Sequence, residues 1–285
     1  MTSHRLARGV FVTLVLVIVL CSAGCSSSSV STSGMKSKSM VLATTTSAED
    51  SGILKRFVDG FESQTGIEVK AVAVGSGAAL FMGRNGDADA MLTHEPVAEK
   101  EFMAGGYGES SVDVMHNQFI VVGPASDPAH VKGSKDAVEA FTRIKNSGKP
   151  FVSRGDASGT NAMEMSIWDR AGIKPAWGGY IVSGRSMGDT LRIADAKNAY
   201  TLTDTATFTA LKGGLSLKPL YEGDPSLINR YTFIVINPKR FPEANHEAAL
   251  ALKKYLLSKK TQKMIASYGK DTFGTVLFYP DALKK

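Results

Sequence analysis

Most of this chain alternates two kinds of apolar pattern. Short unbroken apolar runs, such as residues 40–43 and 231–236, have the length of buried strands. Between such runs lie stretches such as residues 53–61, in which apolar residues recur at the three- and four-residue spacing of a helix. Ser47 followed by Asp50 predicts a capping box at the start of that region. Regular alternation of strand and helix predicts an α/β fold with a largely parallel sheet.

Four of the predicted junctions between a strand and the next helix are rich in Ser, Thr and Gly. They lie at residues 44–47, 75–77, 153–160 and 183–188. Such residues cap helices routinely, so each junction alone is explained by capping. Ligands of open parallel sheets bind beyond the carboxyl ends of the strands, which is where all four junctions must lie. The four together, one of them bearing Arg154, predict convergence on one anion.

One junction combines all the groups that an anion site needs. It reads Ser153, Arg154, Gly155, Asp156, Ala157, Ser158, Gly159 and Thr160. The segment opens a helix, whose first N–H groups have no partner inside the helix and carry the positive end of its dipole. Glycine lets the backbone approach a ligand, hydroxyls add neutral donors, and the guanidinium of Arg154 can make a bidentate contact. The segment is therefore predicted to hold a small anion.

Asp156 bears on which anion that is. Phosphate near neutral pH keeps a proton and needs an acceptor in its site, whereas sulfate, molybdate and tungstate have no proton to donate and are repelled by a bare carboxylate. Asp156 can serve as that acceptor, or it can turn inward and fix Arg154 or its own loop, a common role of Asp in turns. The sequence leaves both alternatives open.

The N-terminal segment has the pattern of an export signal. Arg5 and Arg8 precede an apolar run at residues 10–20, and small residues lead to Cys25. Residues 1–24 are therefore predicted to be a signal peptide rather than a membrane span. Small residues before a Cys resemble a bacterial lipoprotein box, although Ser22 stands where Leu is usual. We expect Cys25 to be lipidated, and the alternative is an ordinary secretory signal.

The composition narrows the remaining possibilities. Residues 25–39 are mostly Ser and cannot bury enough apolar surface to order themselves, so they are predicted to be a tether. Cys21 and Cys25 are the chain's two cysteines, which leaves no disulfide framework or Cys-based metal site for the folded part. The formal net charge is +6, but the basic residues are scattered, so nucleic acid is not an expected partner.

The junctions resemble those of the tungstate-binding periplasmic proteins of ABC importers, relatives of the phosphate- and molybdate-binding proteins. The stretches that carry this resemblance are residues 42–47, 51–52, 74–80, 83–94, 151–160, 187–188, 200–204 and 279–282. The Thr-Thr-Thr-Ser start and the Gly-Asp-Ala-Asp stretch favour tungstate, whereas phosphate-binding relatives carry a string similar to Arg154–Thr160. Departures at Arg185 and at Thr205-Ala206 leave tungstate versus molybdate open.

The resemblance implies a two-lobed periplasmic-binding-protein-like fold of class II that closes on an oxyanion about a hinge. It implies an exported, membrane-anchored and monomeric protein that needs no cofactor and delivers its ligand to an ABC permease and ATPase. The ligand-binding residues that it implies are Thr44, Thr45, Thr46, Ser47, Ser76, Gly77, Arg154, Ser158, Gly159 and Thr160. The alternative ligands within the class are molybdate and phosphate.

Two lobes require the chain to cross between them twice. The first crossing is predicted at residues 122–127, and the return at residues 222–230, where Gly223, Asp224 and Pro225 supply turn chemistry. One lobe would then comprise residues 40–122 plus 229–285, and the other residues 123–228.

A competing prediction is a secreted serine hydrolase. Residues 184–188 match Gly-x-Ser-x-Gly between a strand and a helix, with Ser186 as the nucleophile. Asp204, Asp224 and His246 follow in the order that such hydrolases use. His246 has the surroundings of an exposed helix cap, and no oxyanion segment precedes the motif, so binding is favoured over catalysis. His94, His116 and His130 lack metal-ligand spacing, and His94 is expected to be structural at a strand end.

Overall fold

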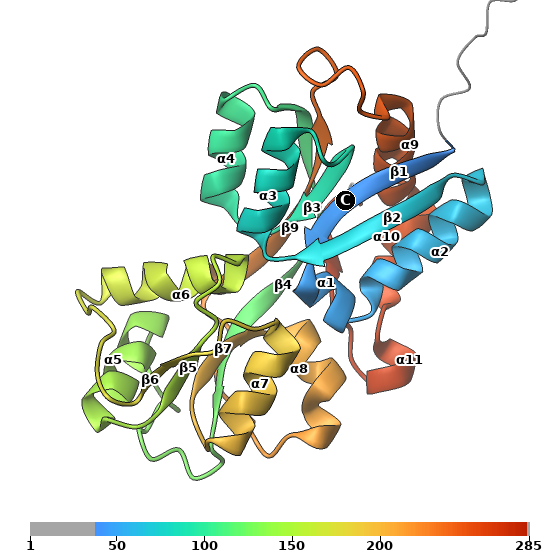
Figure 1. Ribbon diagram of the computed structural model, residues 1–285. Coiled ribbons are helices and arrows are strands. Elements are labelled where there is room, and N and C mark those ends of the chain that lie inside the picture. The colour runs from blue at the N-terminus through green and yellow to red at the C-terminus, as the bar shows by residue number, and fades with distance from the viewer. Residues whose placement is uncertain (1–37, 284–285) are drawn as a thin grey trace, which may run out of the picture. The chain divides into compact units, whose positions relative to one another are not determined.

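Strands β4 (Gly108–Gly123) and β9 (Ile228–Ile236) organise the computed structural model, which describes residues 38–283 (Figure 1). The other strands are β1 (Ser39–Thr45), β2 (Glu68–Val74), β3 (Ala90–Thr93), β5 (Phe151–Ser153), β6 (Tyr180–Val182), β7 (Thr201–Asp204), β8 (Lys218–Tyr221) and β10 (Tyr279–Pro280). The helices are α1 (Thr46–Asp50), α2 (Ile53–Thr65), α3 (Ser76–Asn85), α4 (Pro96–Ala104), α5 (Ala137–Ser147), α6 (Gly159–Arg170), α7 (Met187–Ala196), α8 (Thr205–Leu211), α9 (His246–Leu256), α10 (Lys259–Ser267) and α11 (Lys270–Phe273), with 3₁₀ turns at Lys212–Gly214 and Pro225–Leu227.

The first group of strands has the order β10-β4-β9-β3-β1-β2. Successive side chains of a strand point to opposite faces, and both faces are apolar here. In β9, Phe233 and Val235 pack with α2, α9 and α10, whereas Ile234 and Ile236 pack with α3 and α4. Helices therefore cover both sides of this part of the sheet (Figure 1).

The second group of strands forms around the last residues of β4. These residues pair with β7 and β8, and β5 pairs with β6 and bridges to Tyr200, next to β7. Phe119 and Val121 of β4 pack with α5 and α6, whereas Ile120 and Val122 pack with α7 and α8. The same alternation thus builds a second apolar core on each face.

The predicted α/β class is confirmed, and the sheet is mixed rather than largely parallel. β1 is parallel to β2 and β3, and β5 is parallel to β6, as expected for strand–helix–strand units. β4 and β9 pair antiparallel because the chain passes between the two groups in one direction along β4 and returns along β9. β4 changes its pairing from β9 to β7 between Gln118 and Phe119. The division into two lobes at residues 122–127 and 222–230 stays a prediction.

The predicted capping box at Ser47 and Asp50 is wrong. α1 begins at Thr46, and the side chain of Thr45 caps it by accepting a hydrogen bond from Ala48 N at 3.4 Å. The helix spans only residues 46–50, so Asp50 is its last residue and cannot serve at its start. The predictions for the signal peptide, the lipidated Cys25 and most of the tether lie outside the described residues. No helix within residues 38–283 is long and apolar enough to cross a membrane.

Candidate functional site

The loop between β5 and α6 holds the one arginine among the predicted site residues. Arg154 is 2% exposed, and its Nη2 donates to Asp156 Oδ2 at 2.6 Å and to Thr46 Oγ1 at 3.3 Å. The second oxygen of Asp156 accepts from Ser158 N at 3.2 Å. Asp156 therefore fixes Arg154 and its own loop, which decides between the two alternatives that the sequence left open. Arg154 also contacts α1, which follows β1 in the other group of strands.

α6 begins immediately after this loop. Ser158 caps the helix by accepting from Asn161 N at 3.3 Å, which leaves its O–H able to donate. Thr160 is buried, and its Oγ1 has no hydrogen-bond partner among the described residues. Gly159 is buried against His94, and a Cβ on Gly159 would lie 2.5 Å from the Nδ1 of that histidine. Only a residue without a side chain allows this approach.

The junction between β1 and α1 uses its hydroxyls in three ways. Thr44 Oγ1 donates to Leu92 O at 3.0 Å and ties β1 to β3, and Thr45 is the cap of α1. Thr46 accepts from Arg154. Ser47 is fully buried, and its Oγ has no hydrogen-bond partner at bonding distance among residues 38–283. Thr44 and Thr45 therefore position the backbone, whereas the hydroxyl of Thr46 contacts Arg154.

The junction between β2 and α3 meets the same loop. Gly77 N donates to Ala157 O at 3.2 Å, and a Cβ on Gly77 would lie 2.8 Å from that oxygen. Ser76 is fully buried, and its Oγ accepts from His94 N at 3.4 Å. The predicted residues of three junctions are thus brought into contact with one another.

The fourth junction lies beside α1. Gly188 N, in the first turn of α7, donates to Asp50 Oδ2 at 3.0 Å. Arg185, which departs from the family pattern, is exposed. This junction therefore reaches the first group of elements through α1.

Sequence reasoning missed the part that His94 plays at these contacts. The residue directly follows β3 and is buried, and neither of its ring nitrogens has a hydrogen-bond partner within the geometric limits. Its ring centroid lies 4.8 Å from that of Tyr231. Burial, and secondarily the charge of Arg154, lowers the pKa of His94 to about 3, so the imidazole is neutral and keeps one N–H donor. The sequence signal that could have indicated this part is the position of His94, a polar residue, at the carboxyl end of a predicted strand.

A second missed group consists of buried polar side chains on the strands that link the two groups of elements. Asn229 Nδ2 donates to Asn117 Oδ1 at 2.7 Å, and Asn117 Nδ2 donates to Asp204 Oδ1 at 2.9 Å. Burial raises the pKa of Asp204, whose other oxygen has no partner. Asn117 and Asn229 face each other in the β4–β9 register, a pairing that sequence separation conceals.

Several buried polar atoms around Arg154 lack a partner within the described residues. They are Ser47 Oγ, His94 Nδ1 and Nε2, Arg154 Nε, Thr160 Oγ1, Asp204 Oδ2, Thr207 Oγ1 and Asn229 Oδ1. A buried donor without a partner is costly, and buried polar groups in folded proteins are normally bonded. The hydroxyl, imidazole and guanidinium groups among these can donate to a small oxyanion, whereas Asp204 Oδ2 and Asn229 Oδ1 are acceptors and cannot.

The comparison with known proteins agrees with this arrangement. Residues 27–260 match the PBP superfamily domain. This chain belongs to the PBP superfamily. The PBP-superfamily chain is 42% identical over 279 residues to the tungstate-binding protein TupA of Peptoclostridium acidaminophilum, covering 96% of this chain and 98% of the relative. The family membership predicted from the sequence is confirmed.

Solved structures show the same similarity. The crystal structure of the tungstate ABC transporter from Geobacter sulfurreducens has a TM-score of 0.74 and 38% identity, and the match covers 81% of this PBP-superfamily chain and 98% of that one. The tungstate-binding protein TupA from Desulfovibrio alaskensis G20 has a TM-score of 0.70 and 38% identity over 86% of this chain and 99% of that one.

In this PBP-superfamily chain, the residues that the hydrolase alternative requires form hydrogen bonds with groups outside the proposed relay. Ser186 Oγ caps α7 by accepting from Asp189 N at 3.2 Å, and His246 Nε2 pairs with Glu109 Oε2 at 2.7 Å. Asp224 accepts from Ala137 N at 3.0 Å. These bonds do not build the nucleophile–base–carboxylate relay that the alternative requires. Residues 38–283 contain no group of three or more His, Cys, Asp or Glu side chains that could hold a metal ion.

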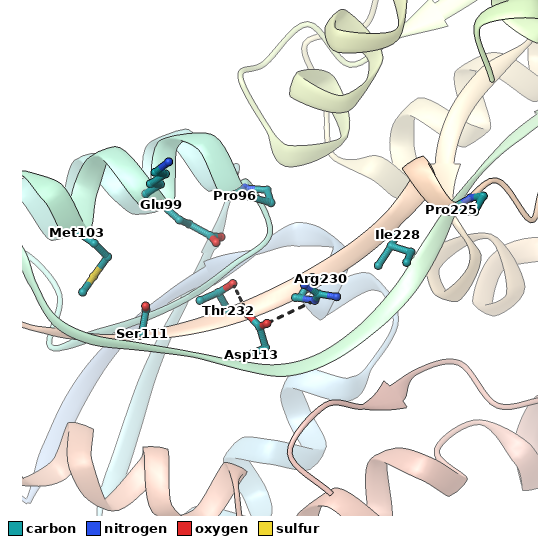
Figure 2. A pocket seen from close by; sticks show the side chains of 10 residues that line it. Pro96, Glu99, Met103, Ser111, Asp113, Pro225, Ile228, Arg230 and Thr232 are labelled. Atoms are coloured by element: carbon teal, nitrogen blue, oxygen red, sulfur yellow. Dashed lines mark hydrogen bonds and ion pairs between the residues drawn. The ribbon is translucent and has the colours of Figure 1, made fainter. Parts of the chain in front are cut away.

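One pocket of the PBP-superfamily chain does not include Arg154 in its lining. It has a volume of about 580 Å³ and lies between α4, β4 and β9, where Asp113 pairs with Arg230 at 3.5 Å (Figure 2). None of the ten predicted ligand-binding residues lines it. A smaller pocket of about 180 Å³ adjoins the predicted site through His94, Gly159 and Asn229.

Proposed function

We propose that this protein binds tungstate as the substrate-binding component of an ABC importer. The observation that carries the proposal is the buried Arg154, which meets the Thr46 hydroxyl of α1 and whose Nε is without a partner among the described residues. α3 and α6 begin at Ser76 and Gly159, so their free N–H groups and positive dipole ends add to this set of donors. Relatives that carry the name of tungstate-binding proteins support the choice of anion.

The state of Asp156 favours a fully ionised oxyanion over phosphate. Both of its oxygens already accept hydrogen bonds, one from Arg154 and one from Ser158 N, so the carboxylate is compensated by groups of its own loop. Tungstate and molybdate present only acceptors and need only donors from the site. On this proposal the Asp156 oxygens, each already bonded to a donor, are weaker acceptors for the proton of hydrogen phosphate than a free carboxylate, so phosphate binds more weakly.

The ten predicted residues divide into three roles within the proposal. Thr46, Ser47, Arg154 and Thr160 offer side-chain donors to the anion. Ser76, Gly77, Ser158 and Gly159 supply the starts of α3 and α6, and Thr44 and Thr45 hold the junction in place. Closure of two lobes about β4 and β9 would bring these donors around the anion.

Calorimetric titration of the purified protein with tungstate, molybdate, sulfate and phosphate tests the proposal. We expect tungstate and molybdate to bind much more tightly than phosphate. Binding of none of the four anions would reject an oxyanion-binding function. Tight binding of phosphate alone would reject the argument from Asp156.

The remaining partners follow from this function. We propose that the protein is exported, is anchored through a lipid on Cys25, acts as a monomer without catalysis, and hands its anion to a permease with an associated ATPase. Cell fractionation of a Cys25→Ser variant tests the anchor. Release of the variant from membranes is expected, and unchanged membrane association would reject lipidation at this position.

A further inference from the structure

One hydrogen bond joins α1 to α7 away from the residues proposed to bind the anion. Asp50, the last residue of α1, accepts from Gly188 N at 3.0 Å through Oδ2. Gly188 is the second residue of α7, so its amide has no partner inside the helix. Ser186 caps the neighbouring free amide of Asp189. Asp50, on another helix, therefore accepts the hydrogen bond of an amide that has no partner within α7.

This bond connects the two groups of elements. α1 follows β1 in the first group, and α7 follows β6 in the second. The packing is close, since a Cβ on Gly188 would lie 3.3 Å from Asp50 Oδ2 and 3.2 Å from Leu211 Cδ1. Partial burial raises the pKa of Asp50, because removing water from a carboxylate disfavours its charged form.

We propose that Asp50 is a positioning residue that holds α1 against α7 and thereby strengthens tungstate binding without touching the anion. The inference rests on the proposed function. α1 is only five residues long and begins at Thr46, so fixing its last residue also fixes the Thr46 hydroxyl that accepts from Arg154. A protein that holds its binding arrangement for a larger fraction of the time has a proportionally lower apparent dissociation constant.

The bond needs an oxygen acceptor rather than a charge. Asp50 lies within the influence of Arg154, Asp189 and Arg192, and burial is the largest effect on its carboxylate. Asparagine keeps an acceptor oxygen at the same distance and removes the charge. Alanine removes both, and the hydroxyl of serine is too short to reach Gly188. All three variants are neutral, so comparison of Asp50→Asn with Asp50→Ala and Asp50→Ser separates the effect of the hydrogen bond from that of the charge.

The first measurement is the tungstate dissociation constant by calorimetry. We expect Asp50→Ala and Asp50→Ser to bind about fivefold more weakly than Asp50→Asn, the ratio expected for one ordinary hydrogen bond. Asp189→Ala is the matched control, since Asp189 lies in the same turn of α7, is exposed, and pairs with Arg192 of its own helix. Equal affinities of the Ala, Ser and Asn variants, in a wild-type protein that binds tungstate, would overturn the positioning role.

The second measurement does not depend on any anion. Hydrogen exchange of the peptide that contains Gly188 reports whether its amide is bonded. We expect faster exchange in Asp50→Ala and Asp50→Ser than in the wild type and Asp189→Ala, at equal melting temperatures. Unchanged exchange would overturn the proposal even if the wild type bound no oxyanion. If the wild type bound no tungstate but the variants showed the expected difference in exchange, the proposed function would be rejected. The hydrogen bond between Asp50 and Gly188 would stand.

Discussion

Arg154 concentrates the positive charge of the proposed site in a rigid planar group. Its guanidinium reaches Asp156 and Thr46 together, and its Nε remains available. Lysine carries the same charge as a single point and cannot reproduce these directions. We therefore expect Arg154→Lys to weaken tungstate binding at least about tenfold, or about 1.4 kcal/mol.

Calorimetry on Arg154→Lys tests this prediction, with Arg185→Lys as the matched control because Arg185 is exposed. The control should keep the wild-type affinity. Equal affinities of Arg154→Lys and the wild type would remove Arg154 from the site.

His94 predicts how stability depends on pH. Its pKa falls from 6.5 in the unfolded chain to about 3 in the folded protein, so the unfolded state binds the proton more readily between these values. Stability is therefore lost as the pH falls below about 6.5, with a loss of roughly 2 kcal/mol by pH 5. Urea denaturation at pH 7 and pH 5 measures this loss.

The His94→Gln variant isolates this contribution from other groups. Buried carboxyls with raised pKa values, such as those of Glu164 and Asp204, act in the opposite direction and are common to both proteins. We expect the variant to lose about 2 kcal/mol less than the wild type between pH 7 and pH 5. Parallel losses in the two proteins would show that His94 is accessible to protons in the folded state.

The predictability of single residues depended on where they lie along the chain. Arg154, Ser158 and Thr160 stand in one contiguous motif, so the sequence alone placed them at a helix start. His94 and Asn229 reach the same region from strands that are far apart in sequence, and their proximity depends on the β3–β9 and β4–β9 pairings. Such register is set by tertiary packing and could not be predicted from local spacing.

At the scale of elements, the approach of α3 to the β5–α6 loop depends on one glycine. A methyl group on Gly77 would lie 2.8 Å from Ala157 O, which belongs to the backbone and cannot rotate away. We expect Gly77→Ala to weaken tungstate binding roughly tenfold, because overpacking of this kind costs about 1–3 kcal/mol. Calorimetry measures the loss.

Gly213→Ala is the matched control for this substitution, since no atom lies within 4 Å of a Cβ built there. Gly213→Ala should keep the wild-type affinity and melting temperature, whereas the overpacking in Gly77→Ala should also lower the melting temperature without anion. Wild-type affinity in Gly77→Ala would show that the helix does not need this approach.

The helices that were not predicted from the sequence differ in how clearly their own residues indicate a helix. α5 has Asp136 as its cap and apolar Ala137, Phe141 and Ile144 at helical spacing, so its pattern was available. α1 is too short for any periodicity, and its identity as a helix depends on the cap at Thr45 and on contacts with α7 and α8. A five-residue helix is fixed by its surroundings rather than by its own sequence.

For the whole molecule, tungstate binding is predicted to stabilise the folded state by mass action. Free anion at a hundred times its dissociation constant should add about 2.7 kcal/mol. For a chain of this size that gain raises the melting temperature by roughly 5–10 °C. Differential scanning calorimetry with and without tungstate measures the shift, and Arg154→Ala should show little of it. A shift of equal size in that variant would place the anion elsewhere.

The overall architecture was predictable to the level of class. Alternation of apolar runs and helical spacing predicted α/β, which the structure confirms. The four junctions follow β1, β2, β5 and β6, and their convergence on one anion stays a prediction. The antiparallel pairing of β4 with β9 was not predictable, because each strand has an unremarkable apolar pattern and its direction is decided by where the chain must go next.

The pairing of β4 with β9 has a consequence for the ancestry and engineering of the chain. Gln118 and Ile228 are register partners, so the segment of residues 119–227 leaves and re-enters the first group of elements at neighbouring points. Adjacent ends are the geometric condition for a module inserted into a host domain. A two-residue hairpin turn from Gln118 to Ile228 would join β4 directly to β9 without residues 119–227. The removed segment could then be exchanged between relatives as one unit.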